Sequence, residues 1–452
     1  MESEFHDNRA GPVPSPFWRR ISCNRGFGLA LMLIALFLFR LFYGLSMNFW
    51  KDDERQIYLL GLEWFSTGLW PYFGPDVVHT NQQIAGALQP LLVGLPWHIW
   101  RQPEAPFLLV NLLSFSGLLL LAVYLGRLFP QLPRSLLCLW LFTLPWTLNI
   151  STHVYNPSYL LFASCLFFVA FCEVIPYLRV GLLAPSWAFC MMGFAIGWSL
   201  QLHLSWPLLL PLLAVALLFS WRDRSWRWQH ALMLAIGFMV PTLVLLPTVV
   251  KYGISVPFAP MLANSGINDA NAREPLTIVA RLLSFGAYEL PRFLTERSQD
   301  RWPFLLAHPY LLPFFLVLGA VGVVQPLLAL WSLAKKTTPV SIRILIVFCI
   351  LEVCGAFLAS SRPPTARNYY ILFPFAALAA LSGMSFMFTS KRRRLWFGRL
   401  VGLCIAYQGL LALIHLKEYS LYADRDRVVE ALRAHNHHLL GDRRSPDLPA
   451  TL

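Results

Sequence analysis

Three consecutive carboxylates stand early in the chain, at Asp52, Asp53 and Glu54. They follow directly after an apolar stretch, residues 27–49, that is long enough to cross a bilayer as a helix. Carboxylates beyond the end of such a helix are common as interfacial anchors. They can also serve as a general base, which takes a proton from a hydroxyl or amine nucleophile within hydrogen-bond reach. Their position alone leaves both interpretations open.

The composition predicts a polytopic membrane protein. Of 452 residues, 57% are hydrophobic and only 13% are charged, and the mean hydropathy is +0.56. A soluble domain carries roughly 25% charged residues. We therefore expect an all-α polytopic fold with about eleven transmembrane helices. The apolar segments lie at 27–46, 106–126, 135–150, 157–175, 187–201, 204–220, 230–250, 307–334, 342–360, 368–389 and 396–416.

The distribution of Lys and Arg sets the expected topology. A further apolar stretch, 87–100, is short and contains Pro90 and Pro96, which is typical of an interfacial segment. If it does not cross, basic loops such as Lys391–Arg394 all face the cytoplasm, as the positive-inside rule requires. This gives a cytoplasmic segment 1–26, a transmembrane domain 27–416 and an extracytoplasmic tail 417–452.

Two long outer loops result, 47–105 and 251–306. Loops of this length are usually functional or disordered. Within the first loop, residues 57–65 form a Trp-containing amphipathic pattern that predicts a helix lying along the membrane interface.

The net charge of +13 is read as topogenic, and no nucleic-acid module accompanies it, so no nucleic-acid partner is expected. The eight cysteines show no paired or metal-ligand spacing, and the histidines show no ligand spacing either. We expect no disulfide framework, no metal and no other cofactor.

Several polar side chains fall on the outer side in this topology. His153 and His203 lie in very short turns between apolar helices, which suits either a structural histidine or a site. Arg40 lies inside the first apolar segment, roughly 20 Å of helix below Asp53. A guanidinium there must pair with an anion, snorkel or face a wet cavity. The other candidates are His79, Asn156, Arg292, Arg362, Arg367 and Tyr369.

Asp53-Glu54 at the start of a large first outer loop, with Tyr58 five positions on and Gly68 fifteen on, resembles the GT-C membrane glycosyltransferases. The bacterial branch that contains protein O-mannosyltransferases (glycosyltransferase family 39) and the lipid A aminoarabinose transferase is the most similar. Two departures are Gln89-Pro90, where that branch has Pro-Pro, and the additional acid Asp52. Shorter similarities are Pro90-Leu91-Leu92, Arg127, Asn156-Pro157-Ser158 and Arg367-Asn368-Tyr369-Tyr370.

The resemblance implies inverting transfer of a sugar from a polyprenyl-phosphate donor to a lipid, glycan or protein acceptor at the outer face of a bacterial inner membrane. It implies Asp53 as general base, with Asp52 or Glu54 as helpers or alternates, and Tyr58 in substrate binding. The forked guanidinium of arginine suits the donor phosphate. Candidates for that contact are Arg40, Arg292, Arg362 and Arg367.

Two other classes stay open. A transporter or lipid flippase predicts polar residues near the middle of several spans and often an internal repeat. Beyond Arg40, Glu173 and Glu352 the apolar segments are almost uncharged. A polysaccharide polymerase or ligase is usually organised around a large late outer loop, whereas the acids here lie in the first loop.

Overall fold

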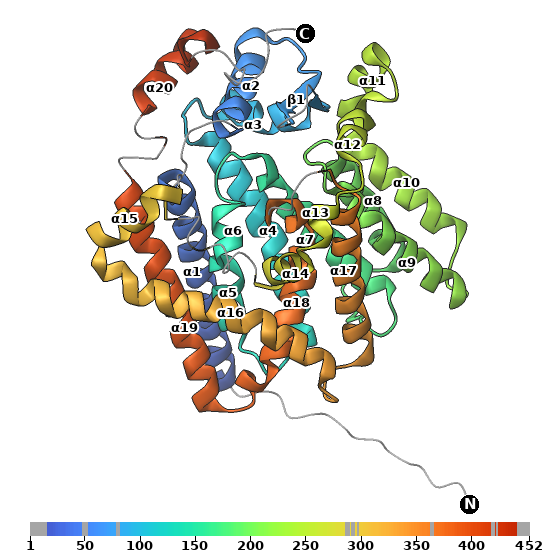
Figure 1. Ribbon diagram of the computed structural model, residues 1–452, viewed down its shortest axis with the longest axis vertical. Helices are drawn as coiled ribbons and strands as arrows, with labels where there is room; N and C mark the ends of the chain where they lie inside the picture. Colours follow the sequence, from blue (N-terminus) through green and yellow to red (C-terminus); the bar gives the residue numbers. More distant parts are fainter. Residues whose placement is uncertain are drawn as a thin grey trace, which may run out of the picture.

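A computed structural model describes residues 16–47, 53–77, 82–284, 290, 294–295, 298–361, 366–416, 421 and 424–440. Within these ranges the chain is almost entirely helical, with one small antiparallel sheet of two strands (Figure 1).

Eight helical segments of the described chain are long and apolar enough to cross a membrane. The expectation of an all-α polytopic membrane protein is therefore confirmed. The segments are Gly26–Ser46 within α1 (Pro16–Ser46), α4 (Ala105–Leu128), Asn156–Val174 (η1, Asn156–Tyr159, and α7, Leu160–Val174), Trp228–Tyr252 (α10, Trp228–Thr242; η3, Leu243–Leu245; α11, Leu246–Tyr252), Pro309–Ala334 (η7, Pro309–Leu311, and α16, Leu312–Ala334), α17 (Val340–Leu358), Arg367–Phe388 (η8, Ala366–Leu372; α18, Phe373–Gly383; η9, Met384–Phe388) and α19 (Lys391–His415).

The other three expected spans form shorter helices, so the count of eleven stays a prediction. Segment 135–150 is divided into α5 (Arg134–Thr143) and α6 (Pro145–Asn149). The division falls at Pro145, because proline has no N–H to donate and its ring clashes with the preceding turn. Segment 187–201 forms α8 (Pro185–Leu200). Segment 204–220 forms η2 (Trp206–Leu209) and α9 (Leu210–Arg222).

Glycines bring α8 and α10 into very close contact. A Cβ atom at Gly237 of α10 would lie 1.9 Å from the carbonyl oxygen of Cys190, and one at Gly193 of α8 would lie 2.1 Å from that of Leu234. Because lipid supplies no hydrophobic drive for helix association, small residues that let backbones approach are the usual contacts between membrane helices.

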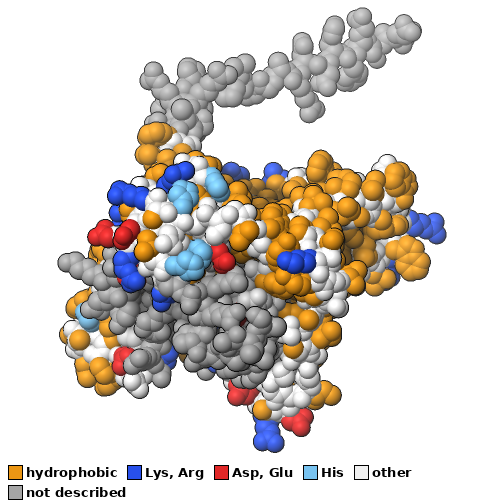
Figure 2. All heavy atoms as spheres, turned by 90° about the horizontal axis from the view of Figure 1, so that it is seen from above, with side chains coloured by type: hydrophobic (Ala, Val, Ile, Leu, Met, Phe, Trp, Pro, Cys, Tyr) orange, Lys and Arg blue, Asp and Glu red, His pale blue; other side chains and the backbone are white. Residues whose placement is uncertain are grey.

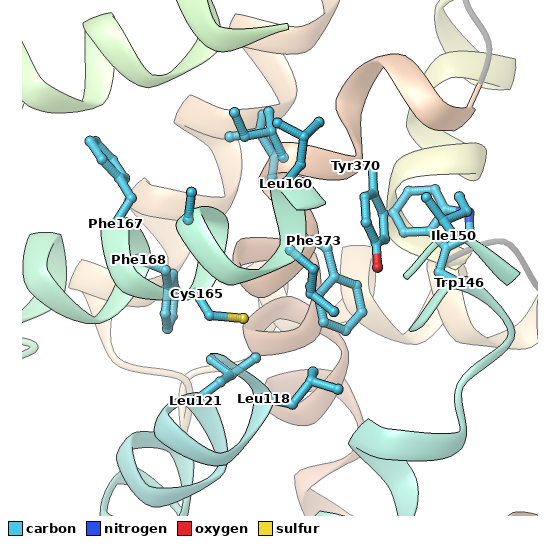
Figure 3. Packing of buried hydrophobic residues seen from close by; sticks show 14 of the residues in the cluster. Leu118, Leu121, Trp146, Ile150, Leu160, Cys165, Phe167, Phe168, Tyr370 and Phe373 are labelled. Carbon is cyan, nitrogen blue, oxygen red and sulfur yellow. The ribbon is translucent and has the colours of Figure 1, made fainter. Parts of the chain in front are cut away.

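The core lies where α4, α7 and α18 meet (Figure 3). Leu118 and Leu121 of α4 are fully buried there. Phe168 of α7 meets the ring of Phe375 of α18 edge to face, with centroids 4.8 Å apart. Tyr370 of η8 packs in the same way against Trp146 of α6, at 5.7 Å. Edge-to-face contacts of this kind add to the burial of the rings.

The first long loop forms a layer at one end of the bundle, at the top of Figure 1. It contains α2 (Asp53–Thr67), β1 (Phe73–Asp76), β2 (Gln83–Ala85) and α3 (Leu88–Ile99). The close approach of α2 and α3 needs glycine, because a Cβ at Gly94 would lie 2.8 Å from the carbonyl oxygen of Gly61. The tail helix α20 (Arg425–Ala434) and η11 (His437–Leu440) lie beside this layer.

The basic loops gather at the opposite end of the bundle. Arg127, in the last turn of α4, donates to the carbonyl oxygens of Val180 and Gly181. Lys335 lies 3.5 Å from the hydroxyl of Ser385, just before the basic start of α19. The loops at this end therefore carry mainly basic side chains, whereas the first-loop end carries acidic and basic side chains together, among them Glu54, Glu104 and Arg425. Seen from the first-loop end, histidine and many charged side chains gather on one side, and hydrophobic side chains with a few basic ones among them cover most of the other (Figure 2).

The second long loop does not lie wholly outside the bundle. Its helix α14 (Pro275–Ser284) packs among α16, α17 and α18. Gln325, buried within α16, donates to the carbonyl oxygen of Leu283 over 3.0 Å. This bond satisfies one of the carbonyls at the C-terminal end of α14. The other short helices of the loop are η4 (Val256–Phe258), α12 (Ala259–Asn264), α13 (Asp269–Ala272), η6 (Ser298–Asp300) and α15 (Arg301–Ala307).

Candidate functional site

Part of the predicted site lies outside the described residues. This applies to Asp52, His79, Arg292 and Arg362. The backbone of Asp53 begins α2, but its side chain is not among those described.

Glu54, in the first turn of α2, lies beside His153. The distance between Oε1 of Glu54 and Nε2 of His153 is 3.3 Å, and the two residues are only 6% and 5% exposed. His153 comes from the short segment between α6 and η1. Burial lowers the pKa of His153 to about 4, in spite of the nearby carboxylate, so the imidazole is neutral at neutral pH. Because the carboxylate only accepts, Nε2 is the donor, and Nδ1 has no partner among the described residues.

The segment that carries His153 is fixed from α1 and α4. Asn111 of α4 donates to the carbonyl oxygen of Thr152 over 2.7 Å. Gly44 of α1 lies directly against the same carbonyl, since a Cβ there would be 2.1 Å from the oxygen. Arg40 of α1 donates to the hydroxyl of Ser151 over 3.0 Å. Residues 151–153 are thus held by hydrogen bonds and by a close backbone contact.

Arg367 adds a cation to the same end of the molecule. Its Nη1 donates to the hydroxyl of Tyr155 over 2.5 Å, and the Tyr155 ring lies 5.8 Å from that of His153. Burial, with a further contribution from the charge of Arg367, lowers the pKa of His203 to about 3. His203 is therefore also neutral at neutral pH, and its Nδ1 lies 2.9 Å from the hydroxyl of Ser205. The structure thus brings together the predicted residues Glu54, His153, Arg367 and His203.

Two other predicted residues pack in the interior. Tyr58 is fully buried, donates to the carbonyl oxygen of Pro103 over 3.1 Å and meets Trp97 edge to face. Burial raises the pKa of Tyr58 well above its ordinary value, so the phenol stays protonated. Tyr369 is also fully buried, with its ring beside Trp146. Both tyrosines contribute to packing around the site.

Asn156 begins η1, three positions beyond His153. Its backbone carbonyl lies 3.5 Å from Nε2 of Gln89, and its own Oδ1 is buried without a partner among the described atoms. A buried amide oxygen with spare hydrogen-bonding capacity is uncommon. It marks Asn156 as a residue that can still accept a bond from a ligand.

Arg40 is the deepest of the predicted residues, and it is 0% exposed. Its guanidinium donates to the carbonyl oxygen of Phe142 and to the hydroxyls of Ser114 and Ser151, at 2.9, 3.1 and 3.0 Å. These partners are not predictable from the sequence. Small polar residues inside apolar segments are the sequence feature that indicates such partners. This feature does not single out Ser114 or Ser151, because serine is common at such positions.

Chemically, this end of the molecule offers a carboxylate held by a neutral imidazole and, nearby, a guanidinium. A carboxylate can accept a proton from a nucleophile, and a guanidinium can hold an anion such as a phosphate. Within the described ranges, His, Cys, Asp and Glu side chains form no group of three or more that could hold a metal ion. Comparisons with protein-family models, with curated proteins and with solved structures found no significant match.

Proposed function

We propose that the chain is an inverting GT-C-type glycosyltransferase that moves a sugar from a polyprenyl-phosphate donor to a lipid, glycan or protein acceptor. The observation that carries the proposal is the convergence of Glu54, His153 and Arg367 at the end of the bundle opposite the basic loops. A proton acceptor and an anion-binding group are the two chemical functions that such a transfer requires.

The roles follow from the reaction. The acceptor hydroxyl or amine attacks the anomeric carbon, the bond from that carbon to the phosphate oxygen breaks, and the polyprenyl phosphate leaves with the electron pair. Asp53 takes the proton of the nucleophile, with Asp52 as an alternate. Glu54, held by His153, orients the start of α2. Arg367, together with Arg292 and Arg362, holds the phosphate, whose negative charge grows as the bond breaks.

The charge difference between the two ends supports an orientation. With the basic loops in the cytoplasm, α2, α3 and the site face the periplasm of a bacterial inner membrane. A donor with a long isoprenoid chain then reaches the site from within the bilayer, which accounts for a catalytic end built directly on membrane-spanning helices.

The described contacts within the spans favour this proposal over a transporter. Glu173 accepts from the backbone N–H groups of Val180 and Gly181 at the basic end of the bundle, and Arg40 is bonded to three protein acceptors. Transporters instead place polar groups around a substrate at mid-membrane. Glu352 of α17 is the exception, since its carboxyl oxygens are buried without partners among the described atoms.

The test is sugar transfer from a panel of radiolabelled polyprenyl-phosphate sugars, measured in membranes. We expect Asp53→Asn to lower transfer by at least ~100-fold, the lower end of the range for loss of a general base, with unchanged protein levels. Asp426→Asn changes an exposed carboxylate on α20, and this matched control should leave transfer unchanged. If only Asp52→Asn loses transfer activity, the general base is Asp52 and not Asp53. Full activity in both variants would make these acids interfacial anchors, and a protein that consumes none of the donors is no such transferase.

A further inference from the structure

The α5–α6 break exposes backbone carbonyls inside the bundle, and side chains satisfy them. The carbonyl oxygen of Leu141 accepts from the hydroxyl of Thr147 over 2.9 Å, and that of Phe142 accepts from Arg40. The carbonyl oxygen of Thr143 lies 3.6 Å from the thiol of Cys404. Within a membrane such groups need internal partners, because no water is present to replace them.

Arg40 links this break to the segment that carries His153. One terminal nitrogen donates to Phe142, and the other donates to Ser114 of α4 and to Ser151. The Ser151 hydroxyl in turn donates to the carbonyl oxygen of Thr147 over 2.5 Å. A single guanidinium therefore joins α1, α4, the end of α5 and the segment that follows α6.

The position of Ser151 matters because His153 is two residues further on. The Glu54–His153 contact of 3.3 Å depends on where this short segment leaves α6. Asn111 donates to the carbonyl oxygen of Thr152, and Arg40 donates to the hydroxyl of Ser151, so both residues before His153 are held. The Nε atom of Arg40 is buried without a partner among the described atoms, so the guanidinium is held entirely by its two terminal nitrogens.

We propose that Arg40 is a positioning residue, which acts through Ser151 to set the place of His153 against Glu54 and makes no contact with the substrate. Its complete burial and its three protein acceptors carry this assignment. The role in catalysis rests on the proposed transferase function, whereas the structural role does not. A guanidinium suits the task because its planar fork donates in several fixed directions at once.

The first measurement is hydrogen–deuterium exchange of the full-length protein in lipid nanodiscs, which needs no activity. In Arg40→Met we expect exchange of backbone amides in residues 144–156 to rise about tenfold, as expected for the loss of buried hydrogen bonds, with α8 unchanged. Ser151→Ala leaves two of the three contacts of Arg40 in place and removes the bond from Ser151 to Thr147 as well, so it keeps the test usable if Arg40→Met fails to fold, and it also raises exchange in the same segment. Gln325→Leu, which removes a buried bond to α14, is the control and leaves 144–156 unchanged.

The second measurement separates positioning from donor binding. We expect Arg40→Met and Ser151→Ala to lower kcat about tenfold or more, with KM for the polyprenyl-phosphate donor within about threefold of the original value. Arg40→Lys restores part of kcat because it keeps the charge and some of the donors. A donor KM raised about tenfold with unchanged exchange would overturn the proposal and make Arg40 a substrate ligand.

The two measurements also separate this inference from the proposed function. Faster exchange in 144–156, in a protein that consumes no lipid-linked sugar, supports the structural role of Arg40 and refutes the transferase alone. Unchanged exchange in Arg40→Met and Ser151→Ala refutes the role of Arg40, whatever reaction the protein performs.

Discussion

Oε1 of Glu54 lies 3.3 Å from Nε2 of His153, although α3, α4, α5 and α6 lie between the two residues along the chain. Both side chains are almost completely buried. A neutral imidazole that donates to a carboxylate satisfies the carboxylate without adding a buried positive charge. The contact therefore ties the first turn of α2, which Asp53 begins, to the membrane-embedded helices.

Replacement of His153 should lower the free energy of unfolding in proportion to the hydrogen bonding that Glu54 loses. In His153→Ala the Glu54 carboxylate loses a buried partner, which costs about 1–3 kcal/mol, whereas His153→Gln keeps a donor and costs less. Thermal unfolding in detergent and sugar transfer both check this order. The exposed His438→Ala is the control. Equal effects of Ala and Gln would contradict a hydrogen-bonding role.

Stability should fall as the pH is lowered from about 6.5 towards 4. The pKa of His153 is about 4 in the folded protein, and an unfolded histidine has a pKa of about 6.5. The unfolded state therefore binds more protons in this window, so protonation favours unfolding. For His153 alone the loss between pH 7 and pH 5 is about 2 kcal/mol. His203, with a folded pKa of about 3, acts in the same direction.

The measurement is the unfolding temperature at pH 7 and pH 5 for the original protein and for His153→Gln. We expect the variant to show the smaller difference between the two pH values, because its side chain does not titrate. A protein that gains stability at pH 5 through His153 would instead contain a charged Glu54–His153 pair, with the pKa of the histidine raised rather than lowered.

Gly44 should not tolerate a side chain. The Cβ of an alanine there would lie 2.1 Å from the carbonyl oxygen of Thr152, so α1 and the segment before His153 must separate. We expect Gly44→Ala to lower the unfolding temperature by several degrees, equivalent to about 1–3 kcal/mol, and to lower transfer. Gly355→Ala in α17 is the control, since its Cβ meets nothing within 4 Å. It should be neutral or slightly stabilising, because alanine favours helices.

The tail helix α20 should be released by loss of one ion pair. Arg425 donates to Glu104 over 2.7 Å and to Gln102 over 3.2 Å, next to α3. If Arg425→Ala costs about 1 kcal/mol, the detached fraction rises about fivefold, and cleavage of the tail by proteinase K accelerates by the same factor. Arg427→Ala removes only exposed contacts within the tail, at 3.6 Å to Asp424 and 3.4 Å to the carbonyl oxygen of Leu439, and serves as the control. Equal cleavage rates in the two variants would mean that other contacts hold the tail.

The membrane class and most helices could be predicted from the sequence, because long apolar segments are a local signal. The break at Pro145 was missed for a physical reason. Hydropathy averages over a window, and residues 135–150 are mostly apolar and carry no charge, whereas a helix is interrupted by one residue that lacks an N–H. The placement of α14 among α16, α17 and α18 was likewise invisible, because it depends on the tertiary contact between Gln325 and Leu283.

The site was predictable in kind and only partly in detail. Outer-face position selected Glu54, His153, His203 and Arg367, and the structure brings them to one end. Their pairing could not be derived, because which side chains meet is decided by how α2 lies on the helices and not by spacing along the chain. Tyr58 was selected by resemblance to a family pattern, and its hydroxyl is bonded within the protein to Pro103.

The burial of Arg40 also bears on how the protein is made. The ribosome completes the first span before Ser114 and Ser151 have been synthesised, and the chain to Ser114 takes about 3–14 s more. During that time the guanidinium has none of its final acceptors. An arginine at the centre of an inserting helix costs about 2.5–3.5 kcal/mol, which is an upper value for Arg40, because the span ends at Ser46. The first span, otherwise strongly apolar with a mean hydropathy of 2.1, therefore inserts before the acceptors of its arginine exist, and the following helices supply them.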